Sequence, residues 1–181
     1  EGAKTFGAKN GSVVAMDIKT GEILLSANVN SFNPHAYWKY PSAYWSNHGF
    51  NYVFEPGSIF KTVAFSYLHN NDKLDRNRLI DTSKKITIGK YTYSDTKYYG
   101  TLTVDEVFTH SSNIGMTQLI RNENNNKQDF YNFLIHAGFG DKTGIYGASE
   151  EAGIVKPVAA WSKTSLTSMA IGYEVLVTPL Q

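Results

Sequence analysis

The chain has 181 residues, enough for one sizeable domain, and its 41% apolar and 18% charged residues are typical of a globular protein rather than a disordered one. The formal net charge is +1 and no long run of either sign occurs, so nucleic-acid binding has no electrostatic support. The absence of cysteine excludes a disulfide scaffold and a thiolate nucleophile, and no apolar run reaches the roughly 18 residues that a membrane span needs.

The first predicted elements are a β-hairpin and a long connection. Residues 12–17 and 22–29 have the composition of two strands, and Gly21 lies in the tight turn between them, where φ > 0 is favoured. Residues 30–54 are rich in Asn, Pro, Tyr and Trp without a period, which predicts a long surface excursion. Long loops in compact domains tend to be functional.

Helices dominate the remaining predicted elements. In chain order these are a helix from about Ser58 to Asn70, a short hairpin at 84–95, a helix opened by the capping-box sequence TVDE at 103–106, a helix from about Ser112 to Arg121, a helix at 126–138 that Gly138 ends, a glycine-rich loop at 139–160, and a helix at 165–172. The mixture lacks βαβ regularity, which favours an α+β fold.

A serine and a lysine lie three residues apart in EPGSIFK, at the predicted start of a helix. Positions i and i+3 share a helix face, so Ser58 and Lys61 can reach one another. A serine hydroxyl becomes nucleophilic when a base takes its proton, and a lysine serves as that base once burial lowers its pKa. The N–H groups of the first helical turn favour a developing negative charge, and that of Ser58 could form half of an oxyanion hole. The pair therefore suits acyl transfer.

The SxxK pattern alone is weak, because the chain contains it twice. SDTK at 94–97 also matches, but it falls in a predicted hairpin, where residues i and i+3 point to opposite faces of a strand. A second motif, SSNIG at 111–115, places Ser111 and Asn113 at the start of another helix, where they could line the far wall of a cleft. SxN also occurs at 26–28, inside a predicted strand, so the ordered combination is the informative feature.

The ordered phrases EPGSIFK, YGTLTVDEVFTHSSNIGM, GFGDKTGI and SMAIGYEVLVTPLQ resemble the transpeptidase domain of class B penicillin-binding proteins, and GSVVAMDIKTGEIL is similar to its first hairpin. The resemblance covers nearly the whole chain, 1–181. The sequences of the motifs are closer to the division-type branch, penicillin-binding protein 3, than to the elongation-type branch. It implies the penicillin-binding protein and serine β-lactamase-like fold, with no metal or organic cofactor, and the histidines show no zinc-ligand spacing.

The resemblance also implies a mechanism. Ser58 would attack the D-Ala-D-Ala carbonyl of a peptidoglycan stem peptide, and Lys61 would accept its proton. Ser111 would pass a proton toward the leaving D-alanine, while Asn113 would hydrogen-bond the substrate amide and orient Lys61. An amine of a neighbouring stem peptide would then complete the cross-link, and a β-lactam would leave Ser58 stably acylated.

The family completes its cleft with a third motif, KTG or KSG, on a strand well downstream of SxN. The two KTG copies here, at 19–21 and 142–144, do not fit that place: the first lies in a hairpin turn, and the second in FGDKTGI, which resembles a structural loop of the family. Since the family continues from VTPLQ into a helix and the strand with the motif, we expect that the fold is incomplete at the C-terminus. This chain alone is then impaired or inactive, unless another chain supplies the missing strands. We likewise expect this chain to lack the membrane anchor and the N-terminal domain of the family.

Several other residues have two interpretations. Glu55 tunes Lys61 or simply favours a helix N-terminus, and His110 is a base or, more often in such places, a packed or solvated side chain. Glu150 or Glu151 would activate a deacylating water in a β-lactamase, but GASEEAGIV is similar to the penicillin-binding loop. The aromatic residues of 37–52 bind a partner or glycan strand, or pack the loop down.

Three functions remain open at this stage. The leading one is a cell-wall transpeptidase that binds stem peptides and β-lactams, lies at the extracytoplasmic face of the bacterial inner membrane and works with cell-division proteins. A serine β-lactamase is the first alternative, and a non-catalytic β-lactam sensor or division-complex module is the second. Lasting acylation separates the first two, and a dispensable Ser58 would favour the third.

Overall fold

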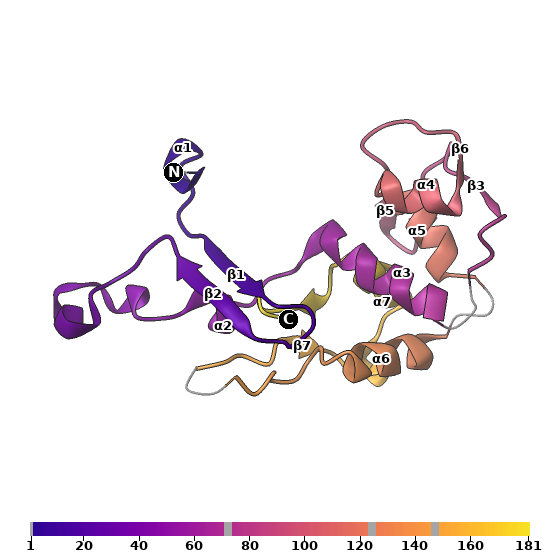
Figure 1. Ribbon diagram of the computed structural model, residues 1–181. Coiled ribbons are helices and arrows are strands. Elements are labelled where there is room, and N and C mark those ends of the chain that lie inside the picture. Colours follow the sequence, from indigo (N-terminus) through magenta and orange to yellow (C-terminus); the bar gives the residue numbers. More distant parts are fainter. Residues whose placement is uncertain (1, 71–73, 123–125, 146–148) are drawn as a thin grey trace. The chain divides into compact units, whose positions relative to one another are not determined.

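The computed structural model describes residues 2–70, 74–122, 126–145 and 149–181 (Figure 1). Contacts divide the chain into two compact units, and both are built from segments distant in sequence. The first unit comprises Glu1–Phe54, Gly138–Ile154 and Val177–Gln181, and the second comprises Glu55–Ala137 and Val155–Leu176. Within the described ranges, no helix combines the length and the apolar character that crossing a bilayer requires.

An antiparallel hairpin forms the sheet of the first unit. Strand β1 (Ser12–Met16) pairs with β2 (Ile23–Asn28), with a register shift at its turn end. The Asp17 carboxylate accepts hydrogen bonds from two N–H groups of the turn, and Gly21 closes it with φ +75°. The predicted hairpin and the role of its glycine are thus confirmed.

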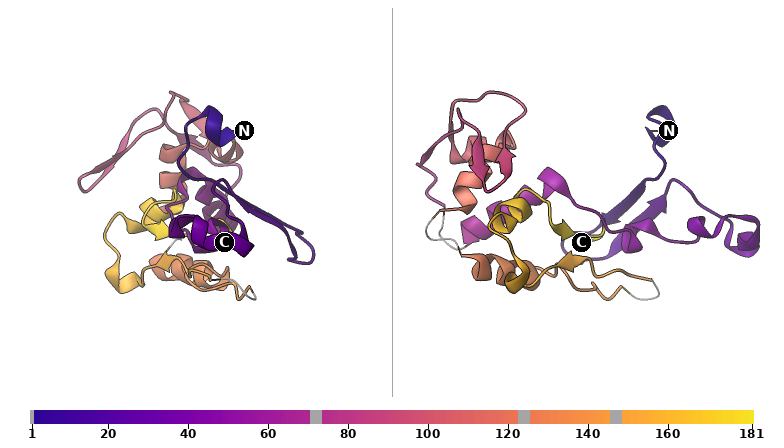
Figure 2. Two further views of the ribbon diagram at one scale, coloured as in Figure 1. Left: turned by 90° about the vertical axis from the view of Figure 1, so that its left-hand side faces the viewer. Right: turned by 180° about the vertical axis from the view of Figure 1, so that it is seen from behind.

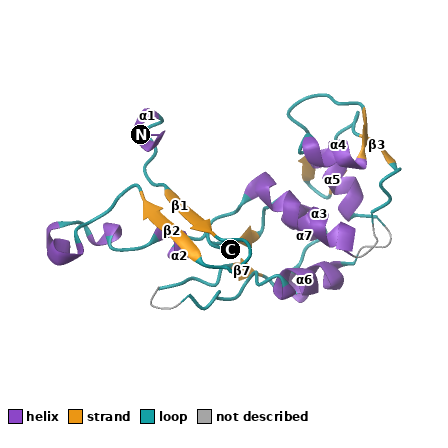
Figure 3. Ribbon diagram, viewed as in Figure 1, coloured by secondary structure: helices purple, strands orange, loops and turns teal. Residues whose placement is uncertain are grey.

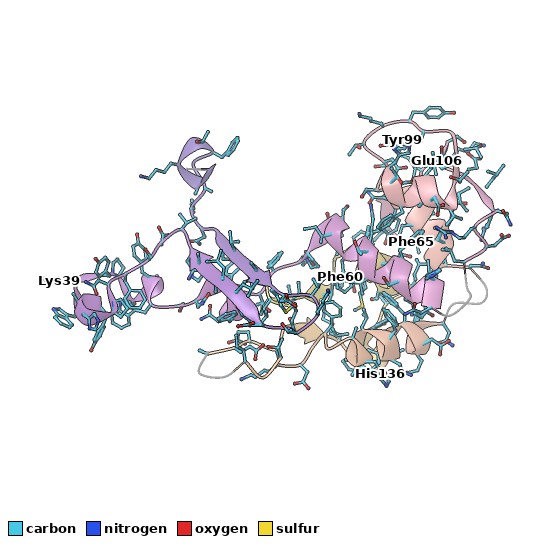
Figure 4. All side chains as sticks on the ribbon, in the orientation of Figure 1. Lys39, Phe60, Phe65, Tyr99, Glu106 and His136 are labelled. Carbon is cyan, nitrogen blue, oxygen red and sulfur yellow. The ribbon has the colours of Figure 1, made fainter. Side chains whose placement is uncertain are left out.

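The connection at 30–54 is more structured than predicted. Asn33 and Asn47 each cap a short helix by accepting a hydrogen bond from a main-chain N–H two residues on. Side chains of its aromatic residues gather around Lys39 (Figure 4). Short helices of the first unit are α1 (Gly2–Thr5), η1 (Pro34–Lys39), η2 (Ser42–Tyr44) and α2 (His48–Asn51).

The C-terminal residues return to the first unit. Phe54 and Val177 form an antiparallel bridge, and the Gln181 amide donates to main-chain oxygens of the predicted glycine-rich loop, those of Asp141 and Ala152. Residues 146–148 of that predicted loop lie outside the described residues. Its remainder contains strand β7 (Ile154–Val155), which pairs with β8 (Val175–Leu176), and the single turn η4 (Val158–Ala160).

The second unit is rich in helices (Figure 3). The capping box predicted at 103–106 is present, because Thr103 and Glu106 exchange side-chain and main-chain hydrogen bonds. The hairpin predicted at 84–95 is also confirmed as the pair β4–β5. The elements are η3 (Gly57–Phe60), α3 (Lys61–Asn70), β3 (Leu79–Asp81), β4 (Ile86–Ile88), β5 (Tyr91–Tyr93), β6 (Thr101–Thr103), α4 (Val104–Thr109), α5 (Asn113–Ile120), α6 (Lys127–His136) and α7 (Ser165–Ala170).

The core of the second unit lies among its helices. Helix α3 contacts both α5 and α7, and α5 also contacts α7 (Figure 2). Phe65 packs against Phe108 of α4 with ring centroids 4.8 Å apart, and Phe60 is buried (Figure 4). Completely buried apolar side chains of this core are Ala64, Tyr67, Leu68, Val104, Met116, Ile120, Phe130, Leu134, Met169 and Ala170.

Candidate active site

Ser58 and Lys61 lie where the chain enters α3. Ser58 belongs to the 3-10 helix η3, which leads directly into α3 at Lys61, so the helix predicted from about Ser58 to Asn70 is confirmed, with its first turn in the 3-10 form. Gly57 takes φ +61° and turns the chain into this segment. Ser58 is exposed, and the Lys61 side chain is buried, with 2% of its surface accessible.

The SSN segment meets the lysine from the connection between α4 and α5. Lys61 Nζ donates to Ser111 Oγ at 3.0 Å and to Asn113 Oδ1 at 2.7 Å, and it also donates to the main-chain oxygen of Ser111. Ser111 has φ +54°, a left-handed conformation that is uncommon for a residue other than glycine. Three acceptors therefore hold the amine in one position, and a strained residue supplies two of them.

This environment changes the basicity of Lys61. Burial lowers the pKa of Lys61 from 10.5 to about 8, and the negative charge of Asp95 opposes that decrease. About a tenth of the lysine is then neutral at pH 7, compared with well under a thousandth for an unperturbed side chain. The structure thus gives this lysine what a general base near neutral pH requires.

The structure brings three of the four predicted residues into one hydrogen-bonded group. Lys61, Ser111 and Asn113 are joined directly, whereas no hydrogen bond within the described ranges links the Ser58 hydroxyl to Lys61. Catalytic hydrogen bonds often tighten only when substrate is bound. Ser58 remains the exposed hydroxyl one turn before the buried amine.

The segment before Ser58 is held against the end of α7. Gly57 N donates to the main-chain oxygen of Gly172 at 3.0 Å. A Cβ at Gly172, which has φ +86°, would lie 1.9 Å from the Gly57 oxygen. The Glu55 carboxylate accepts from Glu174 N at 2.8 Å, which adds a second hydrogen bond between this segment and the residues that follow α7.

Asp95 is the residue of this site that sequence reasoning missed. It lies in the SDTK stretch, which follows strand β5 instead of lying within the hairpin. Its carboxylate accepts hydrogen bonds from the main-chain N–H groups of Asn113 and Ile114 and from the Ser112 hydroxyl. The sequence signal was weak, because no local pattern connects an aspartate to a helix N-terminus seventeen residues later.

The other candidates have structural partners. Glu150 is buried and accepts from Thr143 N and Gly144 N, which ties down the KTG copy at 142–144 as a loop. Burial acts to raise the pKa of Glu150, but the hydrogen bonds from Thr143 and Gly144 outweigh it, and the pKa lies below its usual value. His110 stacks on the Tyr99 ring, with centroids 4.9 Å apart, and it is exposed, which agrees with the interpretation of a packed or solvated side chain.

The aromatic residues of 37–52 contact one another. The Tyr37 ring meets those of Trp38 and Trp45 edge-on, at 5.4 and 5.2 Å, and Trp45 Nε1 donates to the main-chain oxygen of Tyr37. These contacts agree with packing inside the loop. Trp38 is still 65% exposed, so part of this aromatic cluster is also accessible to a partner or a glycan strand.

A pocket of about 450 Å³ opens beside Asn113 within the second unit. Strand β5 forms one side of it, and α7 with the residues that follow forms the other. Its lining combines tyrosine rings with hydroxyl, amide and carboxylate groups: Tyr91, Thr92, Tyr93, Ser94, Asn113, Ser168, Ile171, Tyr173 and Glu174. Such a lining suits a peptide-like molecule with polar and apolar parts. In the described part of the chain, no cluster of three or more His, Cys, Asp or Glu side chains could hold a metal ion.

Sequence comparison relates this geometry to known proteins. The family described as penicillin binding protein transpeptidase domain matches residues 11–181. Penicillin-binding protein PbpB of Mycobacterium tuberculosis is 32% identical over 178 residues, which covers 97% of this chain and 26% of that protein. Peptidoglycan D,D-transpeptidase FtsI of Escherichia coli is 30% identical over 175 residues, 96% of this chain and 29% of that protein. The chain thus spans less than a third of the length of these curated relatives.

Solved structures give the same relation. Penicillin binding protein 3 of Mycobacterium tuberculosis, complexed with aztreonam, has a TM-score of 0.88 and 31% identity, and the match covers 98% of this chain and 40% of that one. The transpeptidase domain of penicillin-binding protein 3 from Burkholderia pseudomallei has a TM-score of 0.82 and 27% identity, covering 97% and 48%.

Proposed function

Because this chain belongs to the penicillin-binding protein transpeptidase family, we propose that it carries the nucleophile and the base of a peptidoglycan D,D-transpeptidase. Membership confirms the family predicted from the ordered motifs, and the similarity to solved transpeptidase domains confirms the predicted fold class. The observation that carries the proposal is the buried Lys61 amine, which hydrogen-bonds Ser111 and Asn113 one helical turn after an exposed serine.

In the proposed acylation, Ser58 Oγ forms a bond to the carbonyl carbon of the penultimate D-alanine. Lys61 in its neutral form takes the Ser58 proton. The C–N bond to the terminal D-alanine then breaks, and the leaving amine receives a proton from Lys61 through the Ser111 hydroxyl. The Ser58 N–H stabilises the oxyanion, and Asn113 binds the substrate amide.

In the second half-reaction, an amine of a neighbouring stem peptide attacks the acyl-enzyme ester. The proton of this amine passes to Lys61 by the same route, and the new amide bond forms the cross-link. The ester bond to Ser58 Oγ then breaks, and Lys61 returns the proton to the Ser58 oxygen. A β-lactam follows only the first half, because its opened ring stays attached and blocks the incoming amine. The tyrosine-lined pocket beside Asn113 is our candidate for the binding of stem-peptide groups.

The test is the intact mass of the complete gene product after incubation with benzylpenicillin. We expect one stable adduct, which is absent from Ser58→Ala and present in Ser66→Ala. Ser66 is the matched control, because it is an exposed serine of α3 whose hydroxyl donates to the main-chain oxygen of Thr62 in the same helix. An adduct that persists in Ser58→Ala would refute the assignment of the nucleophile.

The lifetime of the adduct separates the alternatives. A β-lactamase would release the opened β-lactam within the assay, whereas a transpeptidase would keep it. The contacts of Glu150 favour the transpeptidase, since its carboxylate already accepts two main-chain hydrogen bonds. A non-catalytic module would form no adduct while remaining folded.

The proposed activity also indicates a location and a class of partner. Peptidoglycan lies outside the inner membrane, so we place the complete gene product at the extracytoplasmic face of that membrane. The similarity to FtsI and to penicillin-binding protein 3 supports a role with cell-division proteins. We expect cell-division proteins to be recovered with the complete gene product after cross-linking in cells, and recovery of elongation proteins alone would refute this role.

A further inference from the structure

The carboxylate of Asp95 joins the N-terminus of α5 to the segment that follows β5. We propose that Asp95 is a positioning residue, which holds Ser111 and Asn113 where they meet the Lys61 amine. This inference rests on the proposed function, because it assigns Asp95 to the site through which Ser58 would be acylated. No group of the reaction touches Asp95 in the mechanism above, so its effect passes through the SSN segment.

Hydrogen bonds from three consecutive residues converge on Asp95. Oδ1 accepts from Asn113 N at 2.5 Å and from Ile114 N at 3.0 Å, and Oδ2 accepts from Ser112 Oγ at 2.6 Å. Ser112 Oγ in turn accepts from Gly115 N at 2.8 Å. The first three N–H groups of α5, which have no acceptor within the helix, are therefore all satisfied.

The same segment fixes the amide of Asn113. Asn113 Nδ2 donates to the main-chain oxygen of Ser94 at 3.0 Å, and Oδ1 of that amide accepts from Lys61 at 2.7 Å. Because Ser94 binds the amide nitrogen, the amide oxygen is the atom presented to Lys61. Ser94 and Asp95 thus set both the main chain and the side-chain orientation of Asn113.

The geometry at Ser111 requires such an anchor. Ser111 is left-handed, with φ +54°, and it offers both its hydroxyl and its main-chain oxygen to Lys61. A residue other than glycine leaves this conformation unless its surroundings hold it. On one side Lys61 holds it by hydrogen bonds, and on the other Asp95 holds the residues that follow it.

Because Asp95 is charged, its electrostatic effect on Lys61 can be distinguished from its effect as a helix cap. The groups that Lys61 meets from the α4–α5 connection, Ser111 and Asn113, are uncharged, whereas Asp95 acts on Lys61 electrostatically and raises its pKa against burial. An asparagine at position 95 can keep contacts to the same three groups, since Oδ1 accepts from both N–H groups and Nδ2 donates to Ser112 Oγ, which reverses the direction of that one hydrogen bond. It would remove the negative charge.

The experiment compares Asp95→Ala, Asp95→Asn and Asp105→Ala in the complete gene product. The measured quantity is the second-order rate constant for acylation by benzylpenicillin between pH 5.5 and 9. Asp105→Ala is the matched control, because Asp105 forms an exposed ion pair with Arg76 at the start of α4.

We expect Asp95→Ala to acylate roughly 10–100-fold more slowly, since misplacing a catalytic group by about 1 Å costs up to about a hundredfold. Asp95→Asn should keep most of the rate above pH 8. Its acid limb should move to lower pH, because the loss of the negative charge lowers the pKa of Lys61 and neutral base then persists at lower pH. Asp105→Ala should match the wild type in rate and in pH profile.

Two results would overturn the proposal: an unshifted acid limb in Asp95→Asn, or an alanine variant that acylates like the control. If Asp95→Ala does not fold, the asparagine profile decides. Should the wild type form no adduct, the proposed function fails, and crystal structures of the variants still test the positioning. The Lys61 Nζ to Asn113 Oδ1 distance should exceed about 3.5 Å in the alanine variant and stay within hydrogen-bond range in the asparagine variant. A Lys61 Nζ to Asn113 Oδ1 distance that is the same in the alanine and asparagine variants would also overturn the proposal.

Discussion

Gly172 sets how closely the end of α7 approaches the residue before the nucleophile. The substitution Gly172→Ala adds one methyl group, and the structure places it 1.9 Å from the Gly57 oxygen and 2.5 Å from the Gly57 carbonyl carbon. Neither atom belongs to a side chain that can rotate away, so the main chain must move. The residue that moves with it is Ser58.

The energetic cost has two parts. The left-handed φ of +86° costs an alanine roughly 1–2 kcal/mol, and the forced separation adds an overpacking cost of about 1–3 kcal/mol. Gly138→Ala is a matched control, because Gly138 has φ +89° and no atom lies within 4 Å of the place that the added methyl group would take. We therefore expect a destabilisation of about 2–5 kcal/mol for Gly172→Ala and about 1–2 kcal/mol for the control.

The assay combines thermal unfolding with benzylpenicillin acylation in the complete gene product. A difference of 1 kcal/mol shifts the melting temperature by about 2–4 °C in a domain of this size. Below the melting temperature, Gly172→Ala should acylate roughly a hundredfold more slowly through displacement of Ser58, whereas Gly138→Ala should acylate normally. Equal melting temperatures together with equal acylation rates for the two variants would refute the reasoning.

Three further predictions concern the pH dependence, the helix cap and the loop carboxylate. The acylation rate of the wild type should rise with pH to a midpoint near 8, since only neutral Lys61 accepts a proton; a stopped-flow profile that is flat from pH 6 to 8 would contradict this. Ser112→Ala should lower the free energy of unfolding by about 2 kcal/mol, because it removes the N-cap of α5 and leaves a carboxylate oxygen of Asp95 without its donor. A loss below about 0.5 kcal/mol in chemical denaturation would argue against this capping role. Glu150→Gln should destabilise the protein without shortening the lifetime of the β-lactam adduct. Because the folded-state pKa of Glu150 is depressed, the difference in unfolding free energy between wild type and variant should be full at neutral pH and shrink as pH falls below about 4.5. A difference that does not depend on pH would exclude the ionised carboxylate as its source.

Local patterns were sufficient for much of the fold. The hairpin of β1 and β2 follows from two segments of strand-like composition around a tight turn with Gly21, and α4 follows from its capping box. The sequence does not predict strands β3 and β6, because each has three residues and the paired residues are twenty or more positions apart. Pairing at that distance depends on tertiary contacts and leaves no periodic signal in so short a segment.

The site shows the same division between local and distant information. Ser58, Lys61, Ser111 and Asn113 belong to motifs that can be found in the sequence, although their roles stay predictions until acylation is measured. The sequence assigns Asp95 no role, because its partners begin seventeen residues away. A carboxylate that caps a helix from outside that helix has no sequence signature, and only the folded chain shows it.

Two opposing effects set the pKa of Lys61. Its burial favours the neutral amine, which the proposed reaction needs as a base, whereas its three acceptors and the charge of Asp95 favour the ammonium form. Burial alone would give a base that is neutral but free to rotate, and acceptors alone would hold a permanently charged group. Because both act, the pKa settles at about 8 and the amine stays in place, so one side chain can take a proton from Ser58 and return it through Ser111.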